Sequence, residues 1–269
     1  MHYYTLILAF LWIGCQETNT KQAAVDTTSI EVQEEIVEEK KEPPFNITSA
    51  YVMGKFDPAK DSSFVVIDVK YADRAGLYLR TETYEAFKKM HQAAVEDGIK
   101  LIIRSATRNF DYQKGIWERK WTGVRKVDGK NLSKAIPDPK MRALKILEQS
   151  SMPGTSRHHW GTDIDFNSFN NNYFEKGEGL KIYQWLQANA AEYGFCQTYS
   201  PKGEGGRPEG YNEEKWHWSY LPIAVSLTNF AKENLTDDMI KGFRGAEVAP
   251  EIGIVKKYVL GINPLCQQN

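Results

Sequence analysis

Two short segments, far apart in the chain, carry the residues most able to bind a metal ion. The first reads Ser-Arg-His-His-Trp-Gly-Thr-Asp-Ile-Asp over residues 156–165, and the second reads Glu-Lys-Trp-His-Trp over residues 214–218. A catalytic zinc site needs three nitrogen or oxygen ligands from the protein, an open position for water and a nearby general base. The two segments supply these groups, so the fold is expected to bring them together around one metal.

The residues alone leave the carboxylate ligand open. A strand over residues 164–166 would follow a loop that carries His158, and it would bring an aspartate and this histidine onto one ion. Asp163 and Asp165 share a face of such a strand because side chains alternate, so either can be the ligand. His158 and His159 are adjacent and point apart, so we expect only one of them to bind.

His217 and Glu214 complete the predicted site. Trp216 and Trp218 flank the histidine and are expected to point to the opposite face, where their packing would hold the imidazole still. Glu214 can accept the proton of the attacking water and pass it to a leaving amine. His91, in contrast, lies in a helical pattern and is interpreted as a packed residue.

The chain from about residue 45 onward has the pattern of an α+β domain. Apolar runs predict strands at 64–67 and 101–103. Apolar periodicity predicts helices at 79–97, 180–193, 221–233 and 236–243. Long polar connections are expected at 115–139 and 199–211, and the second leads to Glu214, where it is expected to form one wall of a substrate cleft.

The N-terminus is predicted to direct export and anchoring. Residues 3–14 form an apolar run, shorter than the ~20 residues that span a bilayer, and typical of a secretory signal peptide. It ends in Gly14-Cys15, which resembles a bacterial lipobox. We therefore expect a signal peptide over 1–14 and a lipid on Cys15 that anchors the protein in the membrane, facing the periplasm or cell envelope. The alternatives are plain secretion and a cytosolic protein.

Polar, acidic residues at 15–45 predict a disordered tether ahead of a domain at 46–269. A short solvated helix at 31–42 is compatible with this reading. The net charge of -1 argues against a nucleic-acid partner. No cysteine has a C-x-x-C neighbour. This excludes a cysteine zinc knuckle. If Cys15 is processed separately, Cys196 and Cys266 are left, and they are expected to pair in an oxidising compartment, with free buried thiols as the alternative.

At these motifs the chain resembles the zinc D-alanyl-D-alanine carboxypeptidases and dipeptidases of the VanY and VanX type, which share a fold with the Hedgehog signalling domain. The family pattern S-x-H-x-x-G-x-A-x-D, followed by E-x-W-H, matches residues 156–165 and 214–217. A third family element, a strand followed by S-G-Y-R-S, corresponds to Ile-Ile-Arg-Ser-Ala-Thr-Arg-Asn at 102–109, with Tyr112-Gln113 soon after. The resemblance covers roughly residues 75 to 220.

The resemblance implies a single domain with a small antiparallel sheet, flanking helices and a C-terminal helical extension. It implies Zn²⁺ as the cofactor and assigns its ligands, which are His158, Asp165 and His217. It also implies that Glu214 is the catalytic base and that Arg108 binds the scissile carbonyl and stabilises the oxyanion.

The resemblance further suggests that Ser156 and Gln113 help to hold the terminal carboxylate of the substrate. Two residues depart from the family pattern. Asp163 replaces the usual alanine, and it is expected either to pair with Arg157 or to orient a metal ligand. Ser219 stands where many relatives have arginine.

The activity implied is zinc-dependent removal of the C-terminal D-Ala from peptidoglycan stem peptides, as a D,D-carboxypeptidase. The alternatives are an L,D-carboxypeptidase, an endopeptidase that cuts cross-bridges, and a catalytically silent zinc-bearing binding module. The presence of Glu214 argues against the silent module. The expected partners are stem peptides and, through Cys15, the membrane, and the protein is expected to be a monomer.

Overall fold

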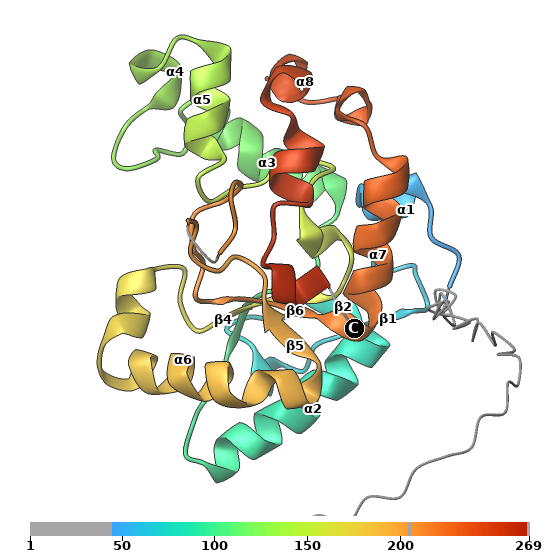
Figure 1. Ribbon diagram of the computed structural model, residues 1–269, viewed down its shortest axis with the longest axis vertical. Coiled ribbons are helices and arrows are strands. Elements are labelled where there is room, and N and C mark those ends of the chain that lie inside the picture. The colour runs from blue at the N-terminus through green and yellow to red at the C-terminus, as the bar shows by residue number, and fades with distance from the viewer. Residues whose placement is uncertain (1–44, 204–205, 268–269) are drawn as a thin grey trace, which may run out of the picture. The chain divides into compact units, whose positions relative to one another are not determined.

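A four-stranded antiparallel sheet, with strand order β3-β4-β6-β5, organises the fold (Figure 1). A second, two-stranded sheet pairs β1 with β2. The strands are β1 (Phe64–Val66), β2 (Tyr78–Arg80), β3 (Ile103–Ser105), β4 (Asp163–Phe166), β5 (Phe195–Gln197) and β6 (His217–Tyr220). The expected α+β class with a small antiparallel sheet is confirmed.

This computed structural model describes residues 45–203 and 206–267. The predicted signal peptide, the lipidated Cys15 and nearly all of the predicted tether lie outside these residues. Within the described ranges, no helix combines the length and the apolar character needed to cross a membrane.

Helices of the described residues surround the four-stranded sheet. They are α1 (Ser49–Val52), α2 (Thr81–Glu96), α3 (Phe110–Trp121), α4 (Leu132–Ala135), α5 (Pro139–Ile146), α6 (Gly177–Asn189), α7 (Leu221–Asn234) and α8 (Ala249–Ile252). Helices α2 and α6 lie on one side of the sheet, whereas α3, α5, α7 and α8 lie on the other (Figure 1). The sheet therefore separates two apolar cores.

The first core lies between the sheet and helices α2 and α6. Phe87 and Met90 of α2 and Leu186 of α6 are fully buried there against Ile164 and Phe166 of β4. Each such side chain contributes about 1.5–3 kcal/mol through burial. His91 packs against Tyr71 at the edge of this core, with ring centroids 4.8 Å apart, so its interpretation as a packed residue is confirmed.

The second core joins α3, α5, α7 and the C-terminal segment. Trp117 of α3, Ile146 of α5 and Leu227 of α7 are buried in it. Because both faces of β4 are covered, all four of its residues are buried, including its two aspartates. Charged groups in such a position require partners.

Several boundaries differ from the sequence-based expectation. The helix expected at 79–97 begins only at Thr81, because Leu79 pairs with Val65 in the β1-β2 sheet. The strand expected at 101–103 lies at Ile103–Ser105. The connection expected at 115–139 contains the second half of α3 and all of α4. The helix expected at 236–243 is wrong, because only a short 3₁₀ turn forms at Asp237–Met239.

The predicted disulfide between Cys196 and Cys266 is present and ties β5 to the C-terminal segment. Asn263 strengthens the same junction, since its backbone N–H donates to Thr198 O at 2.9 Å and its Nδ2 donates to Gln197 O at 3.1 Å. The C-terminal segment thus fixes the edge strand that leads into the loop before Glu214.

Candidate metal centre

Three elements bring the predicted metal ligands together. His158 lies on a 3₁₀ turn (Arg157–His159), Asp165 lies on β4, and His217 begins β6. Asp165 and His217 are direct partners in the antiparallel register of β4 and β6. One ligand atom from each of the three residues lies within 4.8 Å of the others, so these residues form a group able to hold a metal ion. We call this group the triad.

Hydrogen bonds behind the two imidazoles fix which nitrogen faces the triad. His158 Nδ1 donates to Ala106 O at 2.8 Å, so its Nε2 carries the lone pair and lies 3.2 Å from Asp165 Oδ2. His217 Nε2 donates to Asp163 Oδ1 at 2.8 Å, so its Nδ1 faces Asp165 Oδ1 at 2.9 Å. Two imidazole nitrogens and one carboxylate oxygen therefore converge, which is a donor set suited to zinc with an open position.

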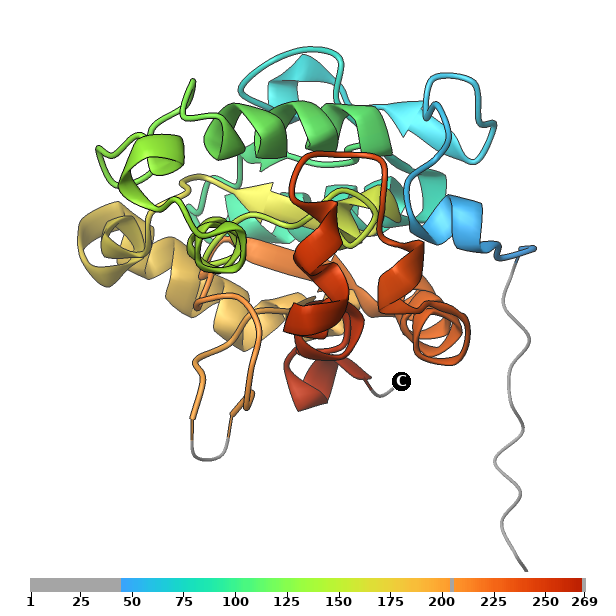
Figure 2. The same cartoon turned by 90° about the horizontal axis from the view of Figure 1, so that it is seen from above.

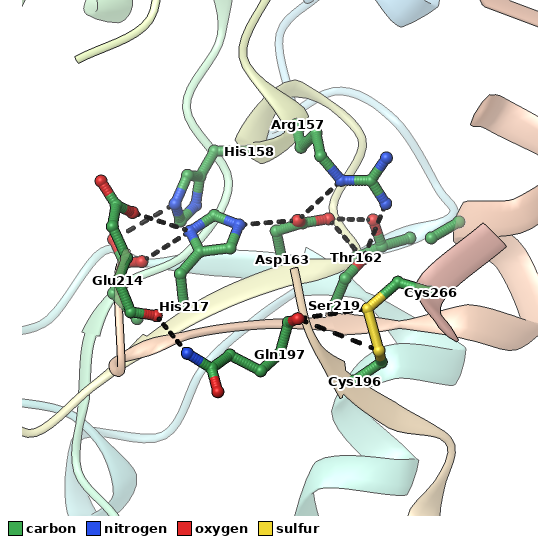
Figure 3. Close-up of polar contacts among 12 residues, drawn as sticks. Arg157, His158, Thr162, Asp163, Cys196, Gln197, Glu214, His217, Ser219 and Cys266 are labelled. Carbon is green, nitrogen blue, oxygen red and sulfur yellow. Dashed lines mark hydrogen bonds and ion pairs between the residues drawn. A yellow bond between two sulfur atoms is a disulfide. The ribbon is translucent and has the colours of Figure 1, made fainter. Parts of the chain in front are cut away.

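Asp163 is not part of the triad, because its carboxylate is occupied elsewhere (Figure 3). The carboxylate accepts hydrogen bonds from Arg157 Nε at 3.2 Å, Thr162 Oγ1 at 2.6 Å and Ser219 Oγ at 2.9 Å, in addition to the bond from His217. All of these groups are buried. Both roles expected for Asp163 are therefore present, since it pairs with Arg157 and orients a ligand. Of the two aspartates, Asp165 is the one that the structure places together with His158 and His217.

Glu214 stands beside the triad in the turn before β6. Its Oε2 lies 3.7 Å from His217 Nδ1, and its carbonyl accepts Gln197 Nε2 at 3.3 Å. Burial raises the pKa of Glu214 to about 8, while His217 and Arg108 oppose that rise. A carboxylate with a raised pKa next to a metal position can exchange a proton near neutral pH.

Arg108 supplies a cation on the same side of the triad. Its Nη1 donates to Ser105 Oγ at 2.7 Å and lies 3.7 Å from Asp165 Oδ2. Both Arg108 and the triad line a cavity of about 370 Å³. The guanidinium is therefore positioned to meet negative charge that develops on a bound substrate.

The two residues expected to hold the substrate carboxylate have different positions. Gln113 lines the cavity, and its Nε2 donates to Ser151 O at 2.8 Å while its buried Oε1 has no partner among the described residues. Ser156 is buried and is not among the described residues that line the cavity, and its Oγ has no described partner either. The structure thus brings Gln113, but not Ser156, to the cavity surface.

His159, the second histidine of the pair, is not part of the triad and has a structural role instead, in line with the expectation that only one of the two histidines binds. His159 Nε2 accepts the Gly154 N–H at 3.0 Å, and its Nδ1 donates to Arg108 O at 2.5 Å. Burial lowers the pKa of His159 to about 3, so it is neutral. This ring therefore joins the loop before His158 to the loop that carries Arg108.

The glycine of the first motif has a steric role. Gly161 has a φ of 77°, and a Cβ at this position would collide with the ring of Phe64 in β1. Its carbonyl accepts the Arg80 N–H at 3.1 Å. A larger residue would push the start of β4 away from β1 and β2 and so displace the triad.

Residues at the ends of the 199–211 loop were not identified from the sequence. Tyr199 and Tyr211 line the cavity, and the Tyr199 ring lies 4.6 Å from the His217 ring, so this loop forms part of the cleft wall as expected. Arg207 is fully buried and donates to the carbonyls of Ser200 and Tyr211 at 2.8 and 2.9 Å. The described parts of the loop, residues 199–203 and 206–211, project away from the core (Figure 2). In the sequence, only the Gly and Pro content of this segment indicated a loop near the site.

Known proteins resemble the part of the chain that carries this site. The putative carboxypeptidase YodJ of Bacillus subtilis is 29% identical over 174 residues, covering 62% of this chain and 55% of that protein. A D-alanyl-D-alanine carboxypeptidase of Enterococcus faecalis is 28% identical over 137 residues, covering 51% and 46%. The chain thus spans about half the length of the curated relatives it matches.

Solved structures with limited likeness include two peptidases. The LdcB LD-carboxypeptidase, described in terms of peptidoglycan recognition, shows 24% identity over 68% of this chain and 77% of that chain, with a TM-score of 0.47. A mutant of the D,D-pentapeptidase VanY in complex with Zn(II) shows 22% identity over 61% and 87%, with a TM-score of 0.43.

The family model for VanY, described as D-alanyl-D-alanine carboxypeptidase, matches residues 76–223. This range contains Arg108, Gln113, the triad and Glu214. The match covers more than half of the chain and includes all three motifs. The chain therefore belongs to the VanY family of D-alanyl-D-alanine carboxypeptidases.

Proposed function

We propose that this chain is a zinc-dependent carboxypeptidase that removes the C-terminal D-Ala from peptidoglycan stem peptides. The observation that carries the proposal is the convergence of His158, Asp165 and His217 on one point of a cavity, with Glu214 beside them. A purely structural metal site would be closed by protein ligands and would not need an adjacent carboxylate base.

Each residue of the site has a distinct part in hydrolysis. When bound, zinc supplies a Lewis acid that lowers the pKa of water to about 7 and polarises a carbonyl. Glu214 takes the proton from the attacking water and delivers it to the departing amine. Arg108 stabilises the negative charge that forms on the scissile carbonyl oxygen. His158 and His217 keep their lone pairs toward the triad because Ala106 O and Asp163 accept their other N–H groups.

D,D-specificity is the first choice because the matching family model and one curated relative are described as D-alanyl-D-alanine carboxypeptidases. L,D-carboxypeptidase action is the alternative on the same residues. The proposed site of action is the cell envelope, with a lipid on Cys15 and residues 15–45 as a tether. This part rests on the apolar run at 3–14 and the Gly14-Cys15 pair.

Mass spectrometry of digested stem peptides tests the proposal. The zinc-loaded protein should release one D-Ala from a pentapeptide that ends in D-Ala-D-Ala, and Glu214→Gln should not. Release of the terminal residue from a tetrapeptide alone would replace the D,D assignment with the L,D one. Cleavage inside a cross-linked dimer, without terminal release, would indicate an endopeptidase. If zinc binds and none of these peptides is cut, the enzymatic proposal is wrong.

A further inference from the structure

The cavity that contains the triad has an excess of positive side chains. Five cationic residues line it, whereas the only carboxylates among its described lining residues are Asp165 and Glu214 of the candidate site. Two of the cations have evident contacts, because Arg108 lies beside Asp165 and Arg74 pairs with Asp73 at 3.0 Å. The other three are Arg119, Lys120 and Arg125, which we call the basic wall.

One face of α3 carries Gln113, which is expected to hold the substrate carboxylate, and also two residues of the basic wall. Gln113, Ile116 and Lys120 line the cavity at helical spacing, and Arg119 lies beside Lys120. After α3 the chain turns back at Gly123, and the Arg125 N–H donates to Arg119 O at 2.7 Å. This turn places the Arg125 guanidinium on the wall next to the last turn of α3.

No carboxylate among the described residues forms a close ion pair with the basic wall. Within residues 45–203 and 206–267, none lies within 4.0 Å of the charged nitrogens of Arg119, Lys120 or Arg125. Lys120 Nζ donates instead to Ser150 Oγ, and Asp128 in the following loop pairs with Lys145 at 2.6 Å. Three neighbouring cations without an ion-pair partner repel one another, and an anion bound among them would relieve that repulsion.

The helix sets the distance between the wall and the reacting end of the substrate. Gln113 and Lys120 are separated by seven residues along α3, or roughly 10 Å at about 1.5 Å per residue. An extended peptide covers roughly the same length in about three residues at ~3.3 Å each. A peptide whose C-terminal residue lies near Gln113 would therefore present an internal residue to the wall.

We propose that the basic wall is an anion subsite of the substrate cleft, and that it binds a carboxylate on an internal residue of the peptide, about three residues before the C-terminal one. This proposal rests on the proposed function, since it assumes that a peptide C-terminus lies at the triad. A carboxylate suits the wall because a guanidinium can bind it through two parallel hydrogen bonds. The preferred substrate is thus an acidic peptide, with a charge in addition to its terminal carboxylate.

The test uses the full-length, zinc-loaded protein and two pentapeptides that end in D-Ala-D-Ala. They differ only in whether the second residue has a free carboxylate or a carboxamide. We expect kcat/KM to favour the carboxylate peptide by about 10- to 100-fold, as for a charge-assisted hydrogen bond. The variant Arg119→Gln/Arg125→Gln should lose this preference, and Arg74→Gln should keep it, because Arg74 lines the same cavity but is paired with Asp73.

Affinity measured by calorimetry separates failure of the subsite from failure of the enzyme. Zinc-loaded Glu214→Gln should bind the carboxylate peptide more tightly than the carboxamide peptide by a similar factor. Equal kcat/KM on the two peptides, with hydrolysis intact, would overturn the subsite and leave the proposed function standing. If the unmodified protein cuts neither peptide, the proposed function fails. Equal affinities of the Glu214→Gln protein for the two peptides would then overturn the subsite as well.

Discussion

Asp163 and His217 are joined by a 2.8 Å hydrogen bond on the side of the imidazole that faces away from the triad. The bond uses the Nε2 proton, and so it leaves Nδ1 as the ring nitrogen that faces Asp165 and Glu214. Such outer partners of metal-bound histidines typically change metal affinity by 10- to 100-fold. The orientation of one predicted metal ligand thus depends on a residue that departs from the family pattern.

Replacing Asp163 with Asn should weaken zinc binding by about 10- to 100-fold. The amide keeps the shape of the side chain but removes the charge that holds the His217 tautomer and neutralises Arg157. Competition with a chromogenic chelator measures the affinity. Thr162→Val is the matched control, because it removes one hydrogen bond to Asp163 and leaves the bond to His217 intact. Equal zinc affinity in Asp163→Asn and the unmodified protein would contradict the orienting role.

The adjacent histidines should respond in opposite ways to the same substitution. His158→Gln should abolish tight zinc binding and hydrolysis while the fold remains. His159→Gln should retain stoichiometric zinc but lower the free energy of unfolding by about 1–3 kcal/mol, because it disturbs buried hydrogen bonds to Gly154 and Arg108. Measuring zinc stoichiometry and urea unfolding of both variants shows which histidine binds the metal and which one stabilises the fold. Loss of zinc from His159→Gln with the fold intact would show that the triad has been assigned the wrong histidine.

Reduction of the Cys196–Cys266 bond should destabilise the domain more than it impairs hydrolysis. The bond closes a separation of 70 residues, and a disulfide of this kind contributes about 2–4 kcal/mol. The double variant Cys196→Ser/Cys266→Ser should therefore unfold at a lower urea concentration than the unmodified protein. Its kcat should stay within a few-fold, because Gln197 still contacts Glu214 O from β5. An unchanged urea midpoint would show that the bond adds no stability.

The KM for an acidic peptide should rise as the pH increases through about 8. Burial lowers the pKa of Lys120 to about 8, with Arg125 and Arg108 acting in the same direction and Glu214 and Asp128 opposing them. The ammonium is charged below this pKa and neutral above it, so the basic wall loses one charge in alkali. Lys120→Arg keeps the charge and should remove the rise. A steady-state KM profile of both proteins is the measurement, and an identical rise in both would exclude Lys120 as its cause.

The site was more predictable from the sequence than the surfaces around it. The triad and Glu214 lie in dense motifs whose residue types have few other uses in that combination. Alternation along β4 did not separate Asp163 from Asp165, because both side chains share one face. Their difference depends on Arg157 and Ser219, which reach Asp163 from a 3₁₀ turn and from β6. Such long-range pairing is set by tertiary packing.

The basic wall was not predictable, because the segment that carries it was expected to be a polar connection. Charged residues such as Glu118 and Arg119 obscure the helical pattern there. Helix α3 forms nevertheless, since Asn109 caps its start and Trp117 and Trp121 bury one face. Most of the stability of such a helix comes from tertiary burial rather than from local propensity, and burial was not evident from this segment alone.

The central claim is that one zinc ion at the triad and the carboxylate of Glu214 together perform the hydrolysis. The most direct test adds Zn²⁺ stepwise to metal-free protein while D-Ala release from a pentapeptide is followed. The account predicts activity that rises linearly and levels off at one equivalent of zinc. It also predicts that Glu214→Gln binds the same equivalent but releases D-Ala at least about 100-fold more slowly. Full activity without metal, or unchanged activity in zinc-loaded Glu214→Gln, would contradict the account.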